Sequence, residues 1–404
     1  MNSREIIKGV SWVGVMDPGL KVFDVIMNTE WGTTYNSYVV KGKDKVAVIE
    51  MVKGGFDDDQ LETIKEIVDP KDIDYIILNH TEPDHSGSLA EFLDQAKNAT
   101  VVSSRPAYIY LKDIVNGDFP HIIAKDGDTI DLGGRTLRFI SAPFLHWPDS
   151  MFTYLVEENI LFSGDVFGCH YCPKDAGHMF NDEVDMDIVP AQRYYFDVIM
   201  SPFKAHMLDA INKIRDMSID IVCPSHGPIL RDNPWDTINM VEGWSKDILD
   251  KNDPKKIFIG YVSAYGNTKR IGEAIAEGIK AEGDFDIEML DISQNDISEI
   301  IPKIDRSDAI LLGSPTINRD ALEPVWRLMS YINAFKNKGK LSAAFGSYGW
   351  SGEAVGMIEG RLKSLGLKVI SPGYRVKLVP NAEELNGAKD FGRKFAHMCM
   401  AANA

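Results

Sequence analysis

Short runs of apolar residues alternate with turn-forming residues along the first two thirds of the 404-residue chain. The runs are rich in β-branched or aromatic side chains, which is typical of strands. Between the first two runs, Leu61, Ile64 and Ile67 recur at helical spacing within residues 57–68. The pattern therefore predicts an α+β fold in which helices cover layered sheets. The predicted strands are residues 45–50, 74–79, 100–104, 137–142, 152–157 and 159–164.

The pattern changes near residue 250. Residues 249–256 are polar, charged and interrupted by Pro254, which indicates an exposed linker. Beyond it, strand-like and helix-like segments alternate, as is typical of a doubly wound parallel sheet. The sequence thus predicts two domains, residues 1–250 and residues 256–404. The strands expected in the second domain are residues 257–262, 286–292, 309–314, 340–347 and 367–374.

Composition narrows the functional classes. The formal net charge of −17 and the pI near 5.0 argue against a nucleic acid or an anionic membrane surface as partner. No apolar run is long enough for a membrane span, and the charged N-terminal segment does not resemble a signal peptide. The only C-x-x-C, Cys169 with Cys172, lacks the second pair that a structural metal knuckle needs. We therefore expect a cytoplasmic protein with reduced cysteines.

The segment "NHTEPDHSGSL", residues 79–89, concentrates metal-ligand side chains directly after a predicted strand. One histidine in such a place is more often a core or turn residue. Four ligand-type side chains within six residues, joined by three more after other apolar runs, favour a metal site instead. The other histidines, at 121, 170, 178, 206 and 397, are given no role. The candidate ligands are His80, Glu82, Asp84, His85, His146, Asp165 and His226.

The size of this set indicates two metal ions. A single zinc site uses three or four protein ligands. Seven ligands suit a pair of ions about 3.5 Å apart that shares one carboxylate, and Asp165 is the expected bridge. The first ion would take His80, Glu82 and His146, and the second would take Asp84, His85 and His226.

The second domain carries a candidate phosphate-binding loop, "SAYGNT", between a predicted strand and a helix. Hydroxyls, backbone N–H groups and a helix N-terminus can hold a phosphate monoester without a cationic side chain. Neither the Walker sequence nor G-x-G-x-x-G is present, and alone the loop could be an ordinary turn. The loop residues are Ser263, Ala264, Tyr265, Gly266, Asn267 and Thr268.

Two further loops favour a flavin. Both follow predicted strands at the carboxyl edge, where doubly wound sheets bind ligands. Tyr348 and Trp350 lie among glycines and are expected to be exposed, which suits stacking on a flat ring, although buried aromatic residues are the commoner case. With the first loop they resemble the flavin-binding loops of flavodoxin, so we expect FMN. The two loops supply Ser314, Pro315, Thr316, Ile317 and Asn318, and Ser347, Tyr348, Gly349, Trp350, Ser351 and Gly352.

The first domain resembles the metallo-β-lactamase fold, whose zinc hydrolases carry H-x-H-x-D-H in the ligand loop. In this chain Glu82 stands where the second histidine would be expected. An anionic oxygen donor favours iron over zinc and stabilises Fe(III). The substitution therefore predicts redox chemistry in place of hydrolysis.

Both domains together resemble the flavodiiron proteins, or A-type flavoproteins, over nearly the whole chain. The resemblance implies an N-terminal αββα domain with two non-haem iron ions and a flavodoxin-like domain with FMN. It also implies reduction of O2 to water, or of nitric oxide to nitrous oxide, by a head-to-tail homodimer or a dimer of dimers. It rests on "GTTYNSYVV", "NHTEPDHSGSL", "LHWPDSMFTYL", "SHGPI", "GSPTIN" and "FGSYGWSGEA".

Asp24 stands where many members of that family have the histidine of a Phe-His-Gly motif, so the choice between O2 and nitric oxide is left open. No four-cysteine rubredoxin-type module follows the second domain, so we expect an external electron donor: rubredoxin, a reduced deazaflavin or, less readily, NADH. The alternatives are a zinc hydrolase fused to a flavodoxin domain and a non-catalytic electron carrier. Trp147, Tyr194 and Tyr195 could line the pocket or pack in the core.

Overall fold

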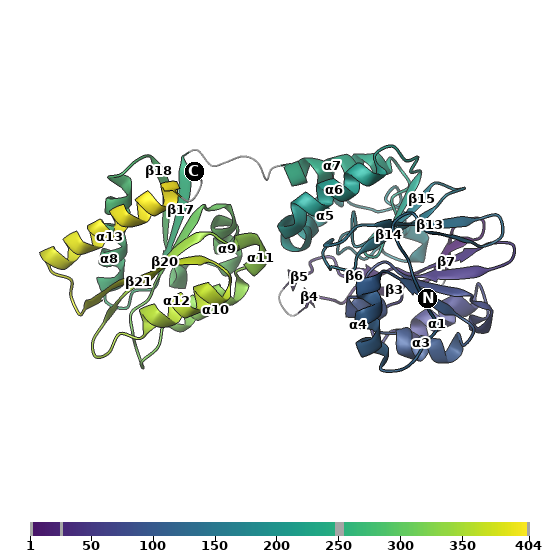
Figure 1. Ribbon diagram of the computed structural model, residues 1–404, viewed down its shortest axis with the longest axis horizontal. Coiled ribbons are helices and arrows are strands. Elements are labelled where there is room, and N and C mark those ends of the chain that lie inside the picture. Colours follow the sequence, from purple (N-terminus) through teal and green to yellow (C-terminus); the bar gives the residue numbers. More distant parts are fainter. Residues whose placement is uncertain (1–2, 25–26, 247–253, 402–404) are drawn as a thin grey trace. The chain divides into compact units, whose positions relative to one another are not determined.

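The structure is a computed structural model that describes residues 3–24, 27–246 and 254–401 (Figure 1). The chain divides into two compact units, Met1–Leu249 and Asp250–Ala404. This division, and most of the predicted linker, lies outside the described residues. No helix in the described ranges has both the length and the apolar character that crossing a bilayer requires.

Two sheets form the centre of the first unit. The larger sheet contains β1 (Arg4–Ile7), β2 (Val10–Trp12), β7 (Tyr38–Lys41), β8 (Val46–Ile49), β9 (Tyr75–Leu78), β10 (Thr100–Ser103) and β11 (His121–Ile123), in that order. The smaller sheet contains β12 (Thr129–Asp131), β13 (Thr136–Ser141), β14 (Met151–Leu155), β15 (Ile160–Gly164) and β16 (Ile221–Pro224). Two short pairs lie outside these sheets: β3 (Val15–Asp17) with β6 (Thr33–Tyr35), and β4 (Val22–Phe23) with β5 (Met27–Asn28).

Helices cover the outer face of each sheet, so the first unit is an αββα sandwich (Figure 1). Trp12 and Tyr38 of the larger sheet share one buried core with Phe139 and Phe162 of the smaller sheet, which joins the two sheets face to face. The larger sheet is covered by α1 (Asp57–Lys65), α3 (Leu89–Gln95) and α4 (Arg105–Val115), and the smaller sheet by α5 (Val189–Tyr195), α6 (Lys204–Ile214) and α7 (Pro234–Lys246).

The second unit is a parallel sheet in the order β18-β17-β19-β20-β21. Apolar clusters lie on both faces, one under α8 and α13 and the other under α9, α10 and α12. The strands are β17 (Lys255–Tyr261), β18 (Phe285–Asp291), β19 (Ala309–Gly313), β20 (Leu341–Tyr348) and β21 (Lys368–Lys377). The helices are α8 (Asn267–Lys280), α9 (Ile297–Arg306), α10 (Glu323–Tyr331), α11 (Ala334–Asn337), α12 (Ala354–Ser364) and α13 (Ala382–Ala401).

All the predicted strands are present, with ends that differ by a few residues. The helix predicted within residues 57–68 is present as α1, but it is shorter and ends at Lys65. Pro70 follows soon after, and the residue before a proline avoids helical dihedrals; Asp69 is extended. The prediction also ended β21 too early. The strand continues past Tyr374 to Lys377, because a register shift against β20 accommodates its Pro–Gly step.

Gly278 allows α8 and α13 to pack closely, since a Cβ on this residue would lie 2.0 Å from the backbone oxygen of Lys389. Gly360, inside α12, has nothing within 4 Å of the same position. We predict that Gly278→Ala lowers the free energy of unfolding of the second unit by about 1–3 kcal/mol. Gly360→Ala should raise it by about 0.5–1 kcal/mol. Urea unfolding of the full chain measures both, and equal effects of the two substitutions would contradict the packing described.

Candidate functional site

Strand ends position the predicted metal ligands in the first unit. His80 follows β9, Asp165 follows β15 and His226 follows β16, each within two residues of the strand's last residue. Asp84 and His85 lie in α2 (Pro83–Ser86), a single helical turn whose first residue is a proline, as suits that position. Glu82 precedes this turn, and His146 lies in the loop between β13 and β14.

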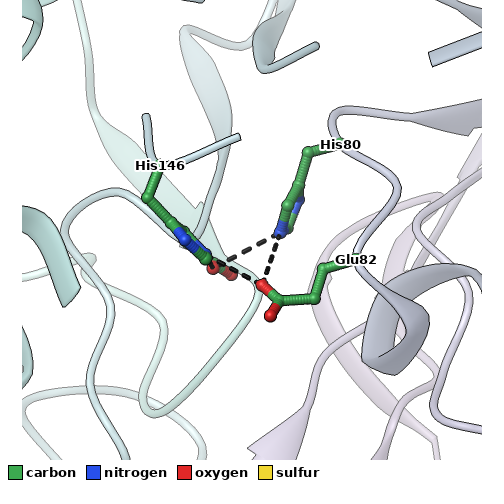
Figure 2. A group of neighbouring side chains, drawn as sticks. His80, Glu82 and His146 are labelled. Carbon is green, nitrogen blue, oxygen red and sulfur yellow. Dashed lines mark hydrogen bonds and ion pairs between the residues drawn. The ribbon is translucent and has the colours of Figure 1, made fainter. Parts of the chain in front are cut away.

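His80, Glu82, His146 and Asp165 form one group of potential metal ligands (Figure 2). Their ligand atoms all lie within 4.8 Å of one another. His146 Nε2 is 2.8 Å from Glu82 Oε2 and 3.1 Å from Asp165 Oδ2. His80 Nε2 is 3.3 Å from the same Asp165 oxygen.

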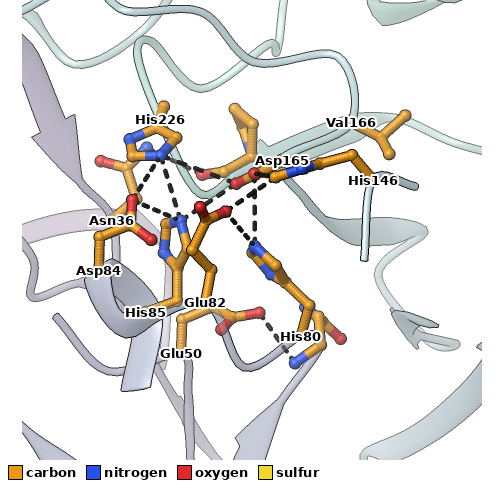
Figure 3. A network of polar contacts seen from close by, with 12 residues as sticks. Asn36, Glu50, His80, Glu82, Asp84, His85, His146, Asp165, Val166 and His226 are labelled. Atoms are coloured by element: carbon orange, nitrogen blue, oxygen red, sulfur yellow. Dashed lines mark hydrogen bonds and ion pairs between the residues drawn. The ribbon is translucent and has the colours of Figure 1, made fainter. Parts of the chain in front are cut away.

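Asp84, His85 and His226 form a second group. His85 Nε2 and His226 Nε2 are 3.2 Å and 3.1 Å from Asp84 Oδ2. Asp165 reaches this group with its other oxygen, because Oδ1 is 3.1 Å from His85 Nε2 and 3.7 Å from His226 Nε2 (Figure 3). One oxygen of Asp165 therefore faces each group, as a bridging carboxylate requires.

The chemistry of this cluster fits a pair of metal ions. His80 Nε2, both oxygens of Asp84 and Asp165 Oδ1 are buried without a hydrogen-bond partner. Buried polar atoms normally have one, and these atoms converge on each other instead. Three carboxylates and four imidazoles, aimed at two points, are a nitrogen and oxygen donor set suited to iron. The structure brings together all seven predicted ligands; their assignment as ligands stays a prediction.

The carboxylates and imidazoles of the site shift each other's pKa values. Burial alone would raise the pKa of Asp165, but positive charge on His80 and His85 holds that pKa well below its ordinary value. Burial would conversely lower the pKa of His85, but Asp84 and Asp165 raise it to about 10. Hydrogen bonds to Asp165 and Glu82 similarly overcome burial and raise the pKa of His146 to about 9. Without metal, these imidazoles are protonated at neutral pH.

Neighbouring backbone groups fix the orientation of His226. Its Nδ1 is 2.6 Å from the carbonyl oxygen of Thr34, which can only accept a hydrogen bond, so Nδ1 carries the proton and leaves Nε2 for a metal. Gly227, next in the chain, has a φ of +78°, and a Cβ there would lie 2.6 Å from the backbone oxygen of Cys169. A glycine is therefore required beside this ligand.

His170 is a buried residue near the site that the sequence prediction left without a role. Its ring centroid lies 4.9 Å from that of His226, and Thr33 Oγ1 is 3.0 Å from its Nδ1. It belongs to neither ligand group. Of the three aromatic residues offered for the pocket, Tyr195 is buried near Asp165, Tyr194 is exposed and Trp147 contacts Tyr110. The only sequence feature that could have placed His170 near the site was its position shortly after Asp165 in the chain.

Three loops at the carboxyl ends of β17, β19 and β20 carry the predicted flavin residues of the second unit. Gly266, with a φ of +79°, is the N-cap of α8 and has no side chain; Ser263 Oγ accepts the N–H of Lys269, and the N–H groups before it in the first turn are left for a phosphate. Trp350 is 95% exposed, as predicted, but Tyr348 is half-buried, so the prediction of an exposed Tyr348 was wrong; Tyr265, in the first loop, is 89% exposed. Such exposure is unusual for large aromatic side chains and fits stacking on a ligand ring.

Other predicted flavin residues make contacts within the protein. Thr268 is buried, with its Oγ1 2.9 Å from Ser347 Oγ. Ser314 is also buried, and its hydroxyl accepts a hydrogen bond from the N–H of Leu322. Arg375, which the sequence prediction missed, lies over the ring of Tyr348 and donates to the backbone oxygen of Gly352. Which of the predicted residues contact FMN stays a prediction.

Comparisons with known proteins agree with this two-part architecture. Residues 33–227 match the ODP family beta lactamase model, and residues 259–392 match flavodoxin. The chain is 44% identical over 401 residues to the flavo-diiron protein FprA2 of Clostridium acetobutylicum, a match that covers 98% of this chain and 99% of that protein. The chain belongs to the flavodiiron protein family.

Relatives of this flavodiiron chain are named for two activities. It is 36% identical over 399 residues to the nitric oxide reductase of Moorella thermoacetica, covering 97% of each chain. Its structure resembles that of the rubredoxin:oxygen oxidoreductase of Desulfovibrio gigas, with a TM-score of 0.74, 27% identity and full coverage of both chains.

Family membership confirms several predictions. This flavodiiron protein is an oxidoreductase, its cofactors are a diiron site and FMN, and its domains have the predicted metallo-β-lactamase-like and flavodoxin-like folds. The zinc hydrolase and the non-catalytic carrier are not favoured, because relatives that match over nearly the full length are named as reductases and oxidoreductases.

Iron uptake should depend on pH. In the metal-free protein His85 and His146 hold protons at pH 7, because their pKa values are raised. A coordinating nitrogen must lose its proton, so lower pH should weaken binding and higher pH should strengthen it until about pH 9 or 10. We predict that Fe(II) binding releases protons and that affinity rises by roughly tenfold per pH unit for each displaced proton. Calorimetry in buffers of different ionisation enthalpy measures the release, and pH-independent affinity would contradict it.

Trp350 should contribute to FMN affinity. We predict that Trp350→Ala raises the dissociation constant of FMN roughly two- to tenfold, because an aromatic stacking pair contributes about 0.5–1.5 kcal/mol. Phe335→Ala is the control: this ring is 71% exposed but lies on α11, outside the three loops. Flavin fluorescence, titrated with flavin-free protein, gives both constants. An equal loss in the two variants would indicate that Trp350 does not stack on the flavin.

Proposed function

We propose that this chain reduces O2 to water and nitric oxide to nitrous oxide at a pair of iron ions, with electrons delivered through FMN. The ligands of one iron are His80, Glu82 and His146, those of the other are Asp84, His85 and His226, and Asp165 is shared. The observation that carries this proposal is that the two oxygens of Asp165 face two separate ligand groups. The metal pair supplies reversible electron transfer and open positions for a small substrate.

The negative charge of the proposed ligand set favours iron at this site. Glu82, Asp84 and Asp165 bring three negative charges to two cations, while the four imidazoles are neutral when they bind metal. Anionic oxygen donors stabilise the higher oxidation state, so this donor set would support both Fe(II) and Fe(III) in a bound iron pair. Glu82 contributes the charge that a histidine at the same position would lack.

Tyr195 is the hydrogen-bond donor that we assign to the site. Burial first, and then the charges of Asp165 and Glu82, raise the pKa of its hydroxyl well above the ordinary value. The hydroxyl is therefore protonated over the whole working pH range. Because so high a pKa makes it a weak acid, it can donate a hydrogen bond to anionic groups but is not a ready source of protons.

Asp24 lies at the same site. Burial and the charges of Glu82 and Asp84 raise the pKa of its carboxyl group. Relatives of this chain include a nitric oxide reductase and a rubredoxin:oxygen oxidoreductase, and Asp24 itself favours neither substrate. We therefore assign both activities.

The exposed flavin loops support proposals for the electron donor and the assembly. Trp350 and Leu378 are exposed and lie on adjoining segments, because Leu378 donates its N–H to the oxygen of Tyr348, and an exposed apolar surface of this kind is unusual on a free protein. We propose that a head-to-tail homodimer, or a dimer of dimers, covers this surface and pairs each flavin with the partner's irons. Rubredoxin or a reduced deazaflavin would be the donor, and NADH less readily. Sedimentation of the holoprotein as a monomer would contradict the assembly.

The proposed compartment is the cytoplasm. All four cysteines are free, and burial raises the pKa values of Cys169 and Cys172 to about 12, which keeps these thiols protonated and slow to oxidise. Free thiols persist where the environment is reducing.

Substitution of the shared carboxylate tests the proposal. We predict that Asp165→Ala lowers iron content from two ions per chain to one or none and lowers O2 and nitric oxide consumption by roughly a hundredfold or more. Flavin absorbance should be unchanged, because the flavin loops belong to the other unit. The exposed Asp216→Ala is the matched control.

The assay is anaerobic titration of the fully reduced protein against O2 and against nitric oxide, with iron counted by elemental analysis. Asp165→Ala that keeps two irons and wild-type consumption would refute the ligand set. Two zinc ions per chain with hydrolytic turnover would instead support the zinc hydrolase.

A further inference from the structure

Glu50 is a buried carboxylate outside the proposed ligand set, close to the metal site (Figure 3). It follows β8 and is 1% exposed. Its φ of +63° lies in the left-handed region, which is costly for a residue other than glycine. Strained backbone of this kind persists where the surrounding structure demands it, and it is common at functional sites.

The backbone around Glu50 holds the segment that carries four of the proposed ligands. Glu50 N–H donates to the oxygen of Ile77, 2.8 Å away, at the end of β9. Its side-chain Oε1 accepts the N–H of Asn79 at 3.0 Å, immediately before His80. The next residue, Met51, donates its N–H to the oxygen of His85 at 3.1 Å. Both ends of the ligand segment are therefore anchored at residues 50 and 51.

One oxygen of the Glu50 carboxylate makes no hydrogen bond. Glu50 Oε2 is buried without a hydrogen-bond partner, and so is Nδ1 of His85. The other nitrogen of that ring faces Asp84 and Asp165, so Nδ1 is the nitrogen directed away from the metal pair. Burial raises the pKa of Glu50 to about 7, and positive charge on His80 and His85 opposes that rise. Glu50 Oε2 and His85 Nδ1 do not hydrogen-bond to each other, so the carboxylate acts on these two imidazoles through its charge.

We propose that Glu50 is a positioning residue that fixes the ligand segment through Asn79 and serves as a charge partner of the neighbouring His80 and His85 imidazoles. This role presupposes the ligand set proposed above. The Glu50 carboxylate makes the His80 and His85 imidazoles stronger donors to the metal and adds a negative charge near the iron pair. Both effects tighten iron binding and favour Fe(III) over Fe(II).

A purely structural role makes a different prediction. Glu50→Gln keeps the size of the side chain and an oxygen that can accept the Asn79 N–H, but it removes the charge. If Glu50 only holds the backbone, this substitution leaves the metal site unchanged. If Glu50 is a charge partner, it changes iron affinity and reduction potential in a folded protein.

The experiment compares wild-type holoprotein, Glu50→Gln and Glu359→Gln. Glu359 is the matched control, since it is also buried and accepts hydrogen bonds from Ser371 and Gly373, but it belongs to the second unit. We expect Glu50→Gln to weaken Fe(II) binding roughly 10- to 100-fold and to raise the reduction potential of the iron pair, with FMN content and melting temperature of the metal-free protein unchanged. Glu359→Gln should leave iron affinity and potential at wild-type values.

Wild-type iron affinity and potential in folded Glu50→Gln would overturn the inference. If that variant does not fold, Glu50→Asp is measured in the same way. Its carboxylate is one methylene shorter, so weakened iron binding in folded Glu50→Asp supports the inference and unchanged binding overturns it. Failure of the wild-type protein to bind two irons would refute the proposed ligand set. If the wild-type protein binds two irons and the Glu50 variants behave like it, only the Glu50 assignment is refuted.

Discussion

The proximity of three carboxylates, two of them buried, is the constraint on which the site depends. Glu82, Asp84 and Asp165 share a small volume from which water is largely excluded, and uncompensated charge there is strongly unfavourable. In the metal-free protein protonated imidazoles compensate this charge, as the raised pKa values of His85 and His146 indicate. Metal cations compensate it better, because they also satisfy the buried atoms that lack hydrogen-bond partners. The folded protein therefore favours the binding of cations at this site.

The two sheets of the first unit make this proximity possible. His80 comes from the larger sheet, whereas Asp165 and His226 come from β15 and β16 of the smaller one. β15 and β16 run parallel, so their carboxyl ends lie side by side. The core shared by the sheets, with Trp12 and Phe162 fully buried, fixes the two sheets relative to each other. Packing far from the ligands therefore sets their separation.

The sequence predicted what local patterns encode. Strand ends, ligand-type side chains and glycine-bracketed aromatic residues are visible in single segments, so the seven candidate ligands and the exposed Trp350 could be named. Contacts between distant segments are not visible in this way. His170, Glu50 and Arg375 acquire their places only when Thr33, Asn79 and Tyr348 pack against them. The hydroxyls of Thr268 and Ser314 show the opposite case. Their loops suggest contact with a ligand, but in the fold these hydroxyls hydrogen-bond to other groups of the protein.

The two candidate sites differ in exposure for a physical reason. The proposed ligands of the first unit are largely buried, whereas Tyr265 and Trp350 of the second unit are almost fully exposed. A diatomic substrate needs little room, so a buried metal pair can receive it while larger reductants are excluded. Electrons from another protein or a large cofactor need an accessible acceptor, which the proposed flavin site with its exposed rings would provide. The burial of one site makes the exposure of the other necessary, because reducing equivalents cannot enter where the substrate does.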